Sequence, residues 1–246
     1  MLSNNLKNVV RVAILLQSIS SIAYAEESIH WSYVGRTGPD HWSKLDKAFE
    51  ACSEGVKQSP IDLNHKNLVN DKAPIIFHYD SHKVALKEYS IKVSNEPSKH
   101  IEIAGKTYKL IQFHFHMPSE HSVDNKTSDA ELHFVHQDHD GNLAVVGVFI
   151  KEGKSNKLIK AIAETATKSN EAKYTLEDSN LMSLLPENKE YFHYMGSLTT
   201  PPCTEGINWY VLKTPIEASK AEIMELKSTI QHNSRPIQDA KGRVAQ

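Results

Sequence analysis

The sequence predicts a single sheet-centred domain of the mainly-β or α+β class, with short peripheral helices. Seven segments have the alternation or the β-branched and aromatic content of strands, at residues 75–79, 89–93, 100–103, 108–116, 130–136, 143–150 and 208–212. Only two stretches have helical periodicity. No repeat, low-complexity tract or Gly/Ser-rich linker divides the 246 residues. These patterns predict the fold class without giving a topology.

The chain begins with a segment typical of a secretory leader. Lys7 and Arg11 precede an apolar run over residues 12–22, and Ala23-Tyr24-Ala25 is a small-residue cleavage pattern. We therefore expect a signal peptide at residues 1–25 and a single mature domain at 26–246. An N-terminal membrane anchor is the alternative, but the run is shorter than the roughly 20 residues that span a bilayer. The leader predicts a periplasmic or extracellular protein that has no membrane contact after cleavage.

Composition excludes several classes of protein. Lys and Arg number 28 and Asp and Glu 30, so there is no strong positive charge with which to bind nucleic acid. Two cysteines are too few for a disulfide scaffold or a four-cysteine zinc site. In an oxidising compartment Cys52 and Cys203 could pair. The alternatives are two free thiols, or Cys203 as a nucleophile.

The remaining elements have local signals. Asp140-Gly141 predicts a tight reversal between two strand segments. Leu158, Ile162 and Ala166 have helical spacing, and Ser219 with Glu222 forms a capping-box pattern ahead of a second apolar stripe. Residues 171–190 lack periodicity and are expected to be irregular.

The most informative segment is residues 109–116, where side chains alternate as in a strand. This alternation predicts one face with Leu110, Gln112, His114 and His116 and another with Ile111, Phe113 and Phe115. Two histidines two residues apart project in parallel at a spacing of about 7 Å. That spacing suits two ligands of one metal ion if a third ligand comes from elsewhere.

A second strand can supply that ligand. His133 shares a predicted face with Glu131 and Val135, and beside the first strand it completes a set of three imidazoles. Gln112 and Glu131 each lie two residues before a candidate ligand and can accept its second ring N–H. Three neutral nitrogen ligands suit Zn²⁺ with a fourth position open for water, which indicates catalysis. The alternative is a polar strand pair on a sheet surface.

A set of motifs lies at residues 30–33, 38–42, 58–61, 112–116, 119–121, 131–136 and 196–202, of which Q-F-H-F-H, A-E-L-H and S-L-T-T-P-P are the most specific. In these motifs the sequence closely resembles the alpha-class carbonic anhydrases, particularly the exported bacterial ones. The resemblance covers nearly the whole chain after the leader. It implies a large central, mostly antiparallel, twisted β-sheet with a conical cleft, and reversible hydration of CO2 to bicarbonate and a proton by attack of zinc-bound hydroxide.

The resemblance also implies roles for individual residues. Thr199 should accept a hydrogen bond from the zinc-bound hydroxide and donate its own to Glu120. Thr200 and an apolar wall are expected at the substrate, the wall consisting of Val135, Val145, Leu198 and Trp209. The two cysteines match the pair seen in bacterial relatives. A homodimer and a monomer both remain open.

The proton-shuttle position departs from the family pattern. Residues 86–93 align with the segment that places a histidine there, and this chain has Tyr89 instead. A tyrosine with a pKa of about 10 relays protons poorly at neutral pH. Tyr89 could instead be an aromatic in the cleft wall, and His100 is an alternative shuttle.

Two other functions are alternatives to CO2 hydration. A non-catalytic binding protein of the same family typically lacks a zinc ligand, whereas this chain retains all three histidines. A zinc hydrolase acting on esters would use the same metal, but no sequence feature indicates a site for a larger acyl group.

Overall fold

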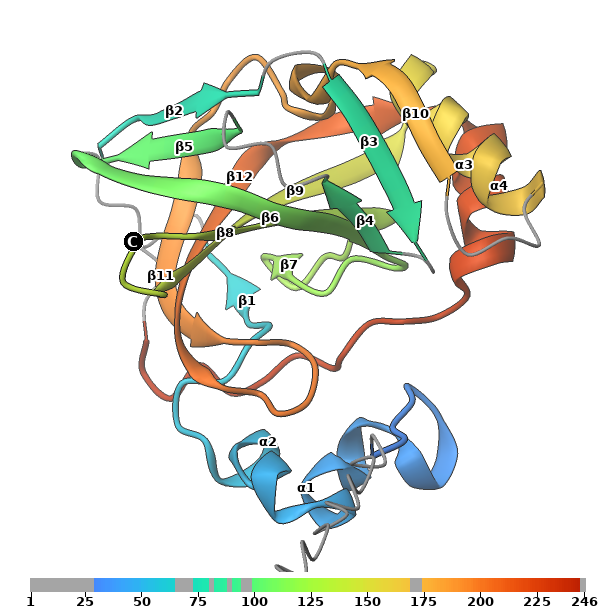
Figure 1. The fold of residues 1–246 in the computed structure, drawn as a ribbon. Helices are drawn as coiled ribbons and strands as arrows, with labels where there is room; N and C mark the ends of the chain where they lie inside the picture. Colours follow the sequence, from blue (N-terminus) through green and yellow to red (C-terminus); the bar gives the residue numbers. More distant parts are fainter. Residues whose placement is uncertain are drawn as a thin grey trace, which may run out of the picture.

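The computed structural model describes residues 29–64, 73–79, 82–87, 90–93, 99–168 and 174–243. Within these ranges, ten strands form one twisted sheet, shown in Figure 1. Eight of them run in the order β10-β3-β4-β6-β8-β9-β12-β11, and β5 pairs with both β6 and β2. All pairs are antiparallel except β12 with β9. The predicted large, mostly antiparallel sheet is confirmed.

The sheet strands include every segment that the sequence predicted. They are β2 (Ile75–His78), β3 (His82–Lys87), β4 (Ser90–Val93), β5 (His100–Ile103), β6 (Lys106–His116), β8 (Ala130–Gln137), β9 (Leu143–Glu152), β10 (Tyr174–Ser179), β11 (Tyr191–Ser197) and β12 (Glu205–Ala218). A separate parallel pair joins β1 (Asp62–Leu63) to β7 (Ser122–Val123). The reversal at Gly141, with φ +89°, connects β8 to β9 as predicted.

Three sheet strands were not predicted. β3 and β11 had no assignment, and β10 falls inside the region expected to be irregular. β10 and β11 are the two ends of the eight-strand path. β11 is nevertheless aromatic and largely buried, with Tyr191, Phe192 and Tyr194 at most 6% exposed, so its strand content was an available signal.

The helices lie at the periphery. They are α1 (Trp42–Leu45), α2 (Ala51–Glu54), α3 (Lys157–Lys168) and α4 (Lys220–Ile230). Short 3-10 helices occupy Gly35–Thr37, Pro39–His41, Lys47–Phe49 and Leu181–Leu184. α3 and α4 pack beside each other, while α1 and α2 lie at the opposite end of the molecule (Figure 1). The capping box predicted for α4 is present, since Ser219 Oγ accepts from Glu222 N and Ser219 N donates to Glu222 Oε2.

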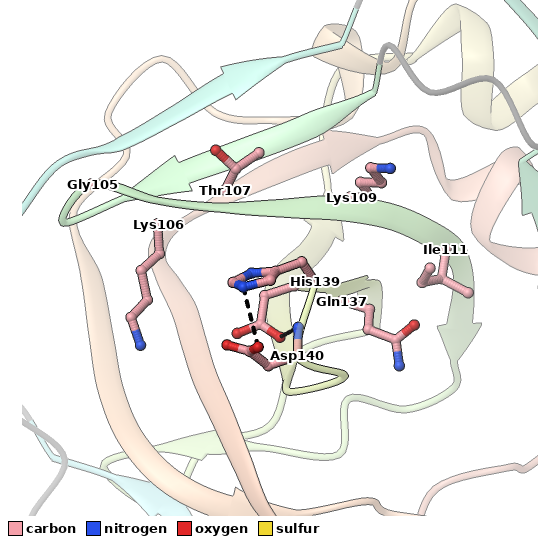
Figure 2. A pocket seen from close by; sticks show the side chains of 9 residues that line it. Gly105, Lys106, Thr107, Lys109, Ile111, Gln137, His139 and Asp140 are labelled. Atoms are coloured by element: carbon pink, nitrogen blue, oxygen red, sulfur yellow. Dashed lines mark hydrogen bonds and ion pairs between the residues drawn. The ribbon is translucent and has the colours of Figure 1, made fainter.

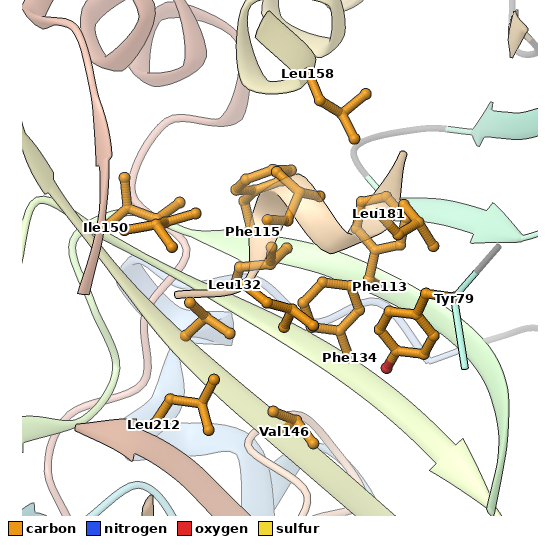
Figure 3. Close-up of a cluster of buried hydrophobic side chains, with 14 of the residues drawn as sticks. Tyr79, Phe113, Phe115, Leu132, Phe134, Val146, Ile150, Leu158, Leu181 and Leu212 are labelled. Carbon is orange, nitrogen blue, oxygen red and sulfur yellow. The ribbon is translucent and has the colours of Figure 1, made fainter. Parts of the chain in front are cut away.

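Two hydrophobic clusters cover the two faces of the sheet. The larger one joins Phe113 and Phe115 of β6 to Leu132 and Phe134 of β8, and it extends to Leu158 of α3 (Figure 3). The smaller one contains Val145, Phe149, Phe192, Trp209 and Val211, among others. The histidine side chains that alternate with Phe113, Phe115, Leu132 and Phe134 therefore face the smaller cluster.

A β-bulge in β6 corrects one sequence prediction. Leu110 pairs with His136 and Gln112 pairs with Val135, so Ile111 is an extra residue opposite this step. Leu110 is consequently buried in the larger cluster, and Ile111 is 45% exposed. The expectation that Leu110 lies on the histidine face, and Ile111 on the phenylalanine face, was wrong. The bulge leaves Gln112, His114 and His116 in the predicted alternation.

The expected leader and any membrane-spanning helix are the last features of the fold. The expected leader, residues 1–25, lies outside the described residues. Among the residues described, no helix is both long enough and apolar enough to cross a bilayer.

Candidate metal centre

β6 and β8 bring the three predicted histidines together. The two strands are adjacent and antiparallel, and His114 pairs directly with His133 in the register. The ring centroid of His116 lies 4.9 Å from that of His114 and 4.5 Å from that of His133. One nitrogen from each ring lies within 4.8 Å of the other two. The three imidazoles therefore converge on one point.

The other ring nitrogen of each histidine has its own hydrogen-bond partner. His114 Nδ1 lies 2.9 Å from Gln112 Oε1, and His133 Nε2 lies 2.9 Å from Glu131 Oε1. His116 Nδ1 lies 2.8 Å from the backbone oxygen of Asn233. Because each of these partners accepts a hydrogen bond, each fixes a tautomer with its N–H on that side. His114 Nε2, His116 Nε2 and His133 Nδ1 are left as lone-pair donors toward the common point.

This arrangement fits a metal ion with nitrogen ligands. His116 Nε2 is buried and has no hydrogen-bond partner, which is costly in a protein interior unless a ligand engages it. Burial lowers the pKa of His116 to about 4 and also lowers the pKa of His133. Burial, followed by the two neighbouring histidines, holds the pKa of His114 well below its usual value. The neutral imidazoles that a metal requires are therefore the stable form at neutral pH.

Glu131 orients His133 and the chain around it. Its Oε1 accepts from His133 and, at 2.7 Å, from His121 Nδ1; its Oε2 accepts from the backbone N–H groups of Glu120 and His121 at 3.0 and 2.8 Å. Burial alone would raise the pKa of Glu131, but the two histidines outweigh it and hold that pKa well below the usual range. The carboxylate is therefore ionised and accepts at both oxygens.

Glu120 lies behind the histidines with Thr199. Glu120 Oε1 accepts from Arg235 N at 2.9 Å and lies 3.4 Å from His116 Nδ1. Burial raises the pKa of Glu120 to about 7, an effect that His133, the Arg235 N–H and a side-chain hydrogen bond from Thr199 oppose. A metal cation nearby would bring this raised pKa down and favour the ionised carboxylate. Thr199 and Glu120 thus meet beside the three histidines.

The loop that carries Thr199 is closed at both ends. Leu198 N donates to Thr204 O at 2.9 Å, and Cys203 N donates to Thr200 O at 2.8 Å. Cys203 forms the predicted disulfide with Cys52, which joins this loop to α2 across a sequence separation of 151 residues. Thr199 is 5% exposed and Thr200 is partly buried beside it.

The four residues predicted as an apolar wall lie in the smaller hydrophobic cluster. Val145 and Trp209 are buried members, and Val135 and Leu198 pack against it. The Trp209 ring contacts the His133 ring at 4.8 Å between centroids. The wall is therefore continuous with the metal centre.

Sequence reasoning missed three residues of this centre. Asn233 and Arg235 contact it through backbone atoms, and hydrogen bonds of their side chains to other parts of the chain hold both residues in place. These contacts span more than 100 residues, so no local pattern predicts them. Gly147 pairs with His133 across β8 and β9, and a Cβ atom there would lie 2.9 Å from Glu131 Oε1. A glycine within an otherwise apolar strand was an available signal of close approach.

The sequence named two candidate proton shuttles, of which the structure describes one. Tyr89, at the shuttle position, is outside the described residues. His100 lies on β5, where its ring stacks on His78 at 4.3 Å.

A surface cavity of about 510 Å³ lies at the far end of β6, between Lys106, Thr107 and Lys109 and the turn at residues 138–140 (Figure 2). None of the three converging histidines lines it.

Comparison with known proteins shows which family this chain resembles. The family model for eukaryotic-type carbonic anhydrase matches residues 37–246. A carbonic anhydrase of Pectobacterium carotovorum is 36% identical over 97% of this chain and 99% of its own length. The alpha-carbonic anhydrase of Thermovibrio ammonificans, solved with the inhibitor sulfanilamide, superposes with a TM-score of 0.80 at 37% identity, over 88% of this chain and 98% of that one.

The same fold also occurs with another ligand. Dioscorin, solved as a complex with ascorbate, has a TM-score of 0.81 at 26% identity, covering 87% of this chain and 96% of its own. The fold by itself therefore does not decide the chemistry, and the histidine centre carries that argument. The fold, the family match and the identities over nearly full length show that this chain belongs to the alpha-class carbonic anhydrase family.

Proposed function

We propose that this protein is a zinc-dependent carbonic anhydrase, a lyase that catalyses the reversible hydration of CO2 to bicarbonate and a proton. The observation that carries the proposal is the convergence of His114, His116 and His133, each with its second nitrogen held by an acceptor. These three residues would hold Zn²⁺. Bound zinc would supply a Lewis acid and a water acidic enough to act as a nucleophile at neutral pH.

Gln112 and Glu131 would keep the ligands in their metal-binding tautomers. The Gln112 carbonyl oxygen accepts the His114 N–H, and the ionised Glu131 accepts that of His133. An anionic acceptor makes an imidazole a better donor of electrons to a metal. Glu131 also accepts two backbone N–H groups, so its position does not depend on the histidines alone.

Thr199 would select the orientation of the nucleophile. A hydroxyl has one hydrogen, and Thr199 would donate it toward Glu120, whose carboxylate can only accept once a nearby cation has lowered its pKa. The Thr199 oxygen can then only accept a hydrogen bond from the side of the three histidines. A nucleophile that carries one hydrogen would donate it to Thr199 and turn its lone pair toward the substrate.

The apolar wall would hold CO2 beside that nucleophile. Its four side chains are those of Val135, Val145, Leu198 and Trp209. The one polar group among them, the Trp209 indole N–H, already donates to Ser197 O at 3.0 Å and is not available to water. A nonpolar substrate loses few hydrogen bonds on entering such a site, whereas a water molecule loses those that it makes in bulk solvent. Thr200, partly buried and next to Thr199, would contact the polar product bicarbonate.

We also propose that the protein is exported, with a signal peptide cleaved after Ala25 and a catalytic domain at 26–246. The Cys52–Cys203 disulfide supports this proposal, because such bonds persist in oxidising compartments. The periplasm and the extracellular space both satisfy that condition. Mass determination of the N-terminus of protein from the periplasmic or culture fraction tests both the cleavage site and the compartment.

Stopped-flow CO2 hydration by the zinc-loaded protein tests the activity. The expected result is a rate far above that of buffer, lost in His133→Ala because two imidazoles cannot hold the ion against water. A wild-type protein with one equivalent of zinc and no rate above buffer would be a non-catalytic family member. Hydrolysis of an activated ester without CO2 hydration would indicate the hydrolase alternative.

A further inference from the structure

The buried side chain of His121 connects Glu131 to Tyr194, a tyrosine of β11 without a role in the proposed reaction. His121 Nδ1 lies 2.7 Å from Glu131 Oε1, and His121 Nε2 lies 2.6 Å from the hydroxyl oxygen of Tyr194. His121 and Glu131 are fully buried, and Tyr194 is 3% exposed. Both ring nitrogens of His121 are therefore hydrogen-bonded within the protein, which fixes the orientation of its ring.

Tyr194 is itself held on several sides. Its hydroxyl group forms a second hydrogen bond, of 2.8 Å, with Ser59 Oγ. Its ring stacks on Trp209 with an interplanar angle of 9°, and the guanidinium group of Arg243 lies 5.8 Å from the ring centroid. Burial holds the pKa of Tyr194 well above its usual value, so the hydroxyl group keeps its hydrogen. A rigid, neutral phenol therefore bonds to His121 at the end remote from the metal centre.

Ser59 joins this phenol to the loop that carries Thr199. Ser59 Oγ accepts from Ser197 N at 3.0 Å, and Ser59 N donates to Ser197 Oγ at 2.9 Å. Ser197 precedes Thr199 by two residues. A Cβ atom at Gly196 would overlap Ser59 Oγ, so the close approach of the two segments requires a glycine. The Tyr194 hydroxyl group is thus linked to Glu131 on one side and to the base of the Thr199 loop on the other.

We propose that Tyr194 is a positioning residue of the metal centre, acting through His121 on the Glu131 carboxylate. The inference rests on the proposed role of His133 as a zinc ligand, because His133 Nε2 lies 2.9 Å from the same oxygen of Glu131. The direction from which His121 approaches that oxygen limits where the carboxylate can lie. Without the Tyr194 hydroxyl group, His121 Nε2 would be buried and unpaired, a cost that the ring relieves by turning away from Glu131.

Zinc affinity, measured by competition with a chromogenic chelator, tests the proposal without relying on catalysis. Tyr194→Phe removes one hydroxyl group and keeps the ring that stacks on Trp209. We expect it to weaken zinc binding about 3–10-fold, less than direct loss of the acceptor would, because Glu131 keeps two backbone N–H donors. Co²⁺-substituted protein gives a second readout, since its visible absorption depends on how the ligands are arranged. The absorption bands of Tyr194→Phe should differ from those of wild type.

Tyr191→Phe is the matched control. Tyr191 lies on the same strand and is 6% exposed, but it belongs to the larger hydrophobic cluster on the other face of the sheet. Its hydroxyl group donates to Ala73 O at 2.6 Å. Removing that hydroxyl group also deletes a hydrogen bond of a largely buried tyrosine, yet it should leave zinc affinity and the Co²⁺ spectrum unchanged.

A double-mutant cycle shows whether Tyr194 acts through Glu131. In Glu131→Gln the link to His133 is already altered, so adding Tyr194→Phe should weaken zinc binding by less than about 2-fold more. The proposal is overturned if Tyr194→Phe has the zinc affinity or the Co²⁺ spectrum of wild type, if Tyr191→Phe weakens binding equally, or if Tyr194→Phe has the same effect in both backgrounds. Wild-type protein that binds no zinc would overturn the proposed function together with this inference, whereas an unaffected Tyr194→Phe in an active zinc enzyme overturns the inference alone.

Discussion

Gly147 leaves no room for a side chain beside Glu131. A Cβ atom at residue 147 would lie 2.9 Å from Glu131 Oε1, closer than real Cβ contacts come. That same oxygen accepts hydrogen bonds from His133 and His121. The absence of a side chain on β9 therefore fixes how closely the carboxylate can approach the metal ligand on β8.

We expect Gly147→Ala to displace Glu131 and weaken zinc binding. The added methyl group must push the carboxylate away from His133 Nε2, and loss of an acceptor on a metal-bound histidine typically lowers affinity about 10–100-fold. Competition with a chromogenic chelator measures this affinity. Gly153→Ala is the control: its Cβ would crowd the partly exposed Glu217 side chain, far from the centre. Equal zinc affinity in both variants would contradict the role assigned to Gly147.

Glu131→Gln tests the charge at the same position. Glutamine has nearly the size of glutamate but one accepting oxygen and no charge, so it cannot accept from two histidines and two backbone N–H groups. Zinc affinity should fall about 10–100-fold, and the CO2 hydration rate at limiting zinc should fall with it. Saturating zinc should restore part of the rate. Unchanged affinity would show that the neutral amide orients His133 as well as the carboxylate does.

The histidine centre was predictable because its geometry follows from two regular strands. A period of two places His114 and His116 on one face, and one neighbouring strand brings in His133. Gln112 and Glu131 lie two residues before the ligands that they contact, so the same period identified them. The resemblance to the family added Glu120 and Thr199, whose pairing across 79 positions of sequence no local pattern could predict.

The parts that were not predicted depend on irregular backbone, on polar strand residues or on contacts between distant parts of the chain. The bulge at Ile111 reverses the faces of Leu110 and Ile111, and a strict alternation contains no sign of it. β10 was missed because it ends in Glu177, Asp178 and Ser179, residue types that strands do not favour, whereas the aromatic residues of β11 were an available signal. Asn233 accepts from His116 through its backbone oxygen, and its side-chain amide bonds to Phe115 O and Met117 N, contacts across more than 100 residues that no local pattern predicts.

Tyr89→His should raise CO2 turnover. The position aligns with the family's proton-shuttle histidine, and imidazole with a pKa near 6.5 exchanges protons at neutral pH far more readily than a phenol. A gain of between severalfold and about 10²-fold in kcat is expected at low buffer concentration, with kcat/KM little changed. High concentrations of a small buffer should reduce the difference. No gain at any buffer concentration would show that residue 89 does not limit proton transfer.

Removal of the disulfide should destabilise the protein more than it impairs the metal centre. The bond closes a loop of 151 residues, and disulfides over long loops typically contribute about 2–5 kcal/mol. The double variant Cys52→Ser with Cys203→Ser should lose that amount of unfolding free energy in urea, with one equivalent of zinc retained in the folded state. Wild-type protein treated with reductant provides the comparison. Loss of zinc before unfolding would instead mean that the disulfide holds the Thr199 loop in place.

Glu222 should make stability depend on pH in the acid range. Its carboxylate accepts from Ser219 N at 2.8 Å, from Asn156 N at 3.1 Å and from Ser155 Oγ, which ties the start of α4 to the chain ahead of α3. Burial alone would raise the pKa of Glu222, but these hydrogen bonds outweigh it and lower that pKa below its usual value of 4.5.

The sign of the effect follows from that shift. The folded state binds the proton less readily than the unfolded state, so the stabilisation is fully present above about pH 4.5 and disappears as the pH falls through the lowered pKa. Glu222→Gln should therefore cost about 1–2 kcal/mol at pH 7, measured by urea unfolding, and progressively less below pH 4.5. Glu190→Gln, which removes an exposed ion pair with Lys213 at 3.5 Å, should change stability by less than about 1 kcal/mol throughout. A Glu222→Gln cost that is the same at pH 7 and pH 3 would contradict an ionised carboxylate as the link between the two helices.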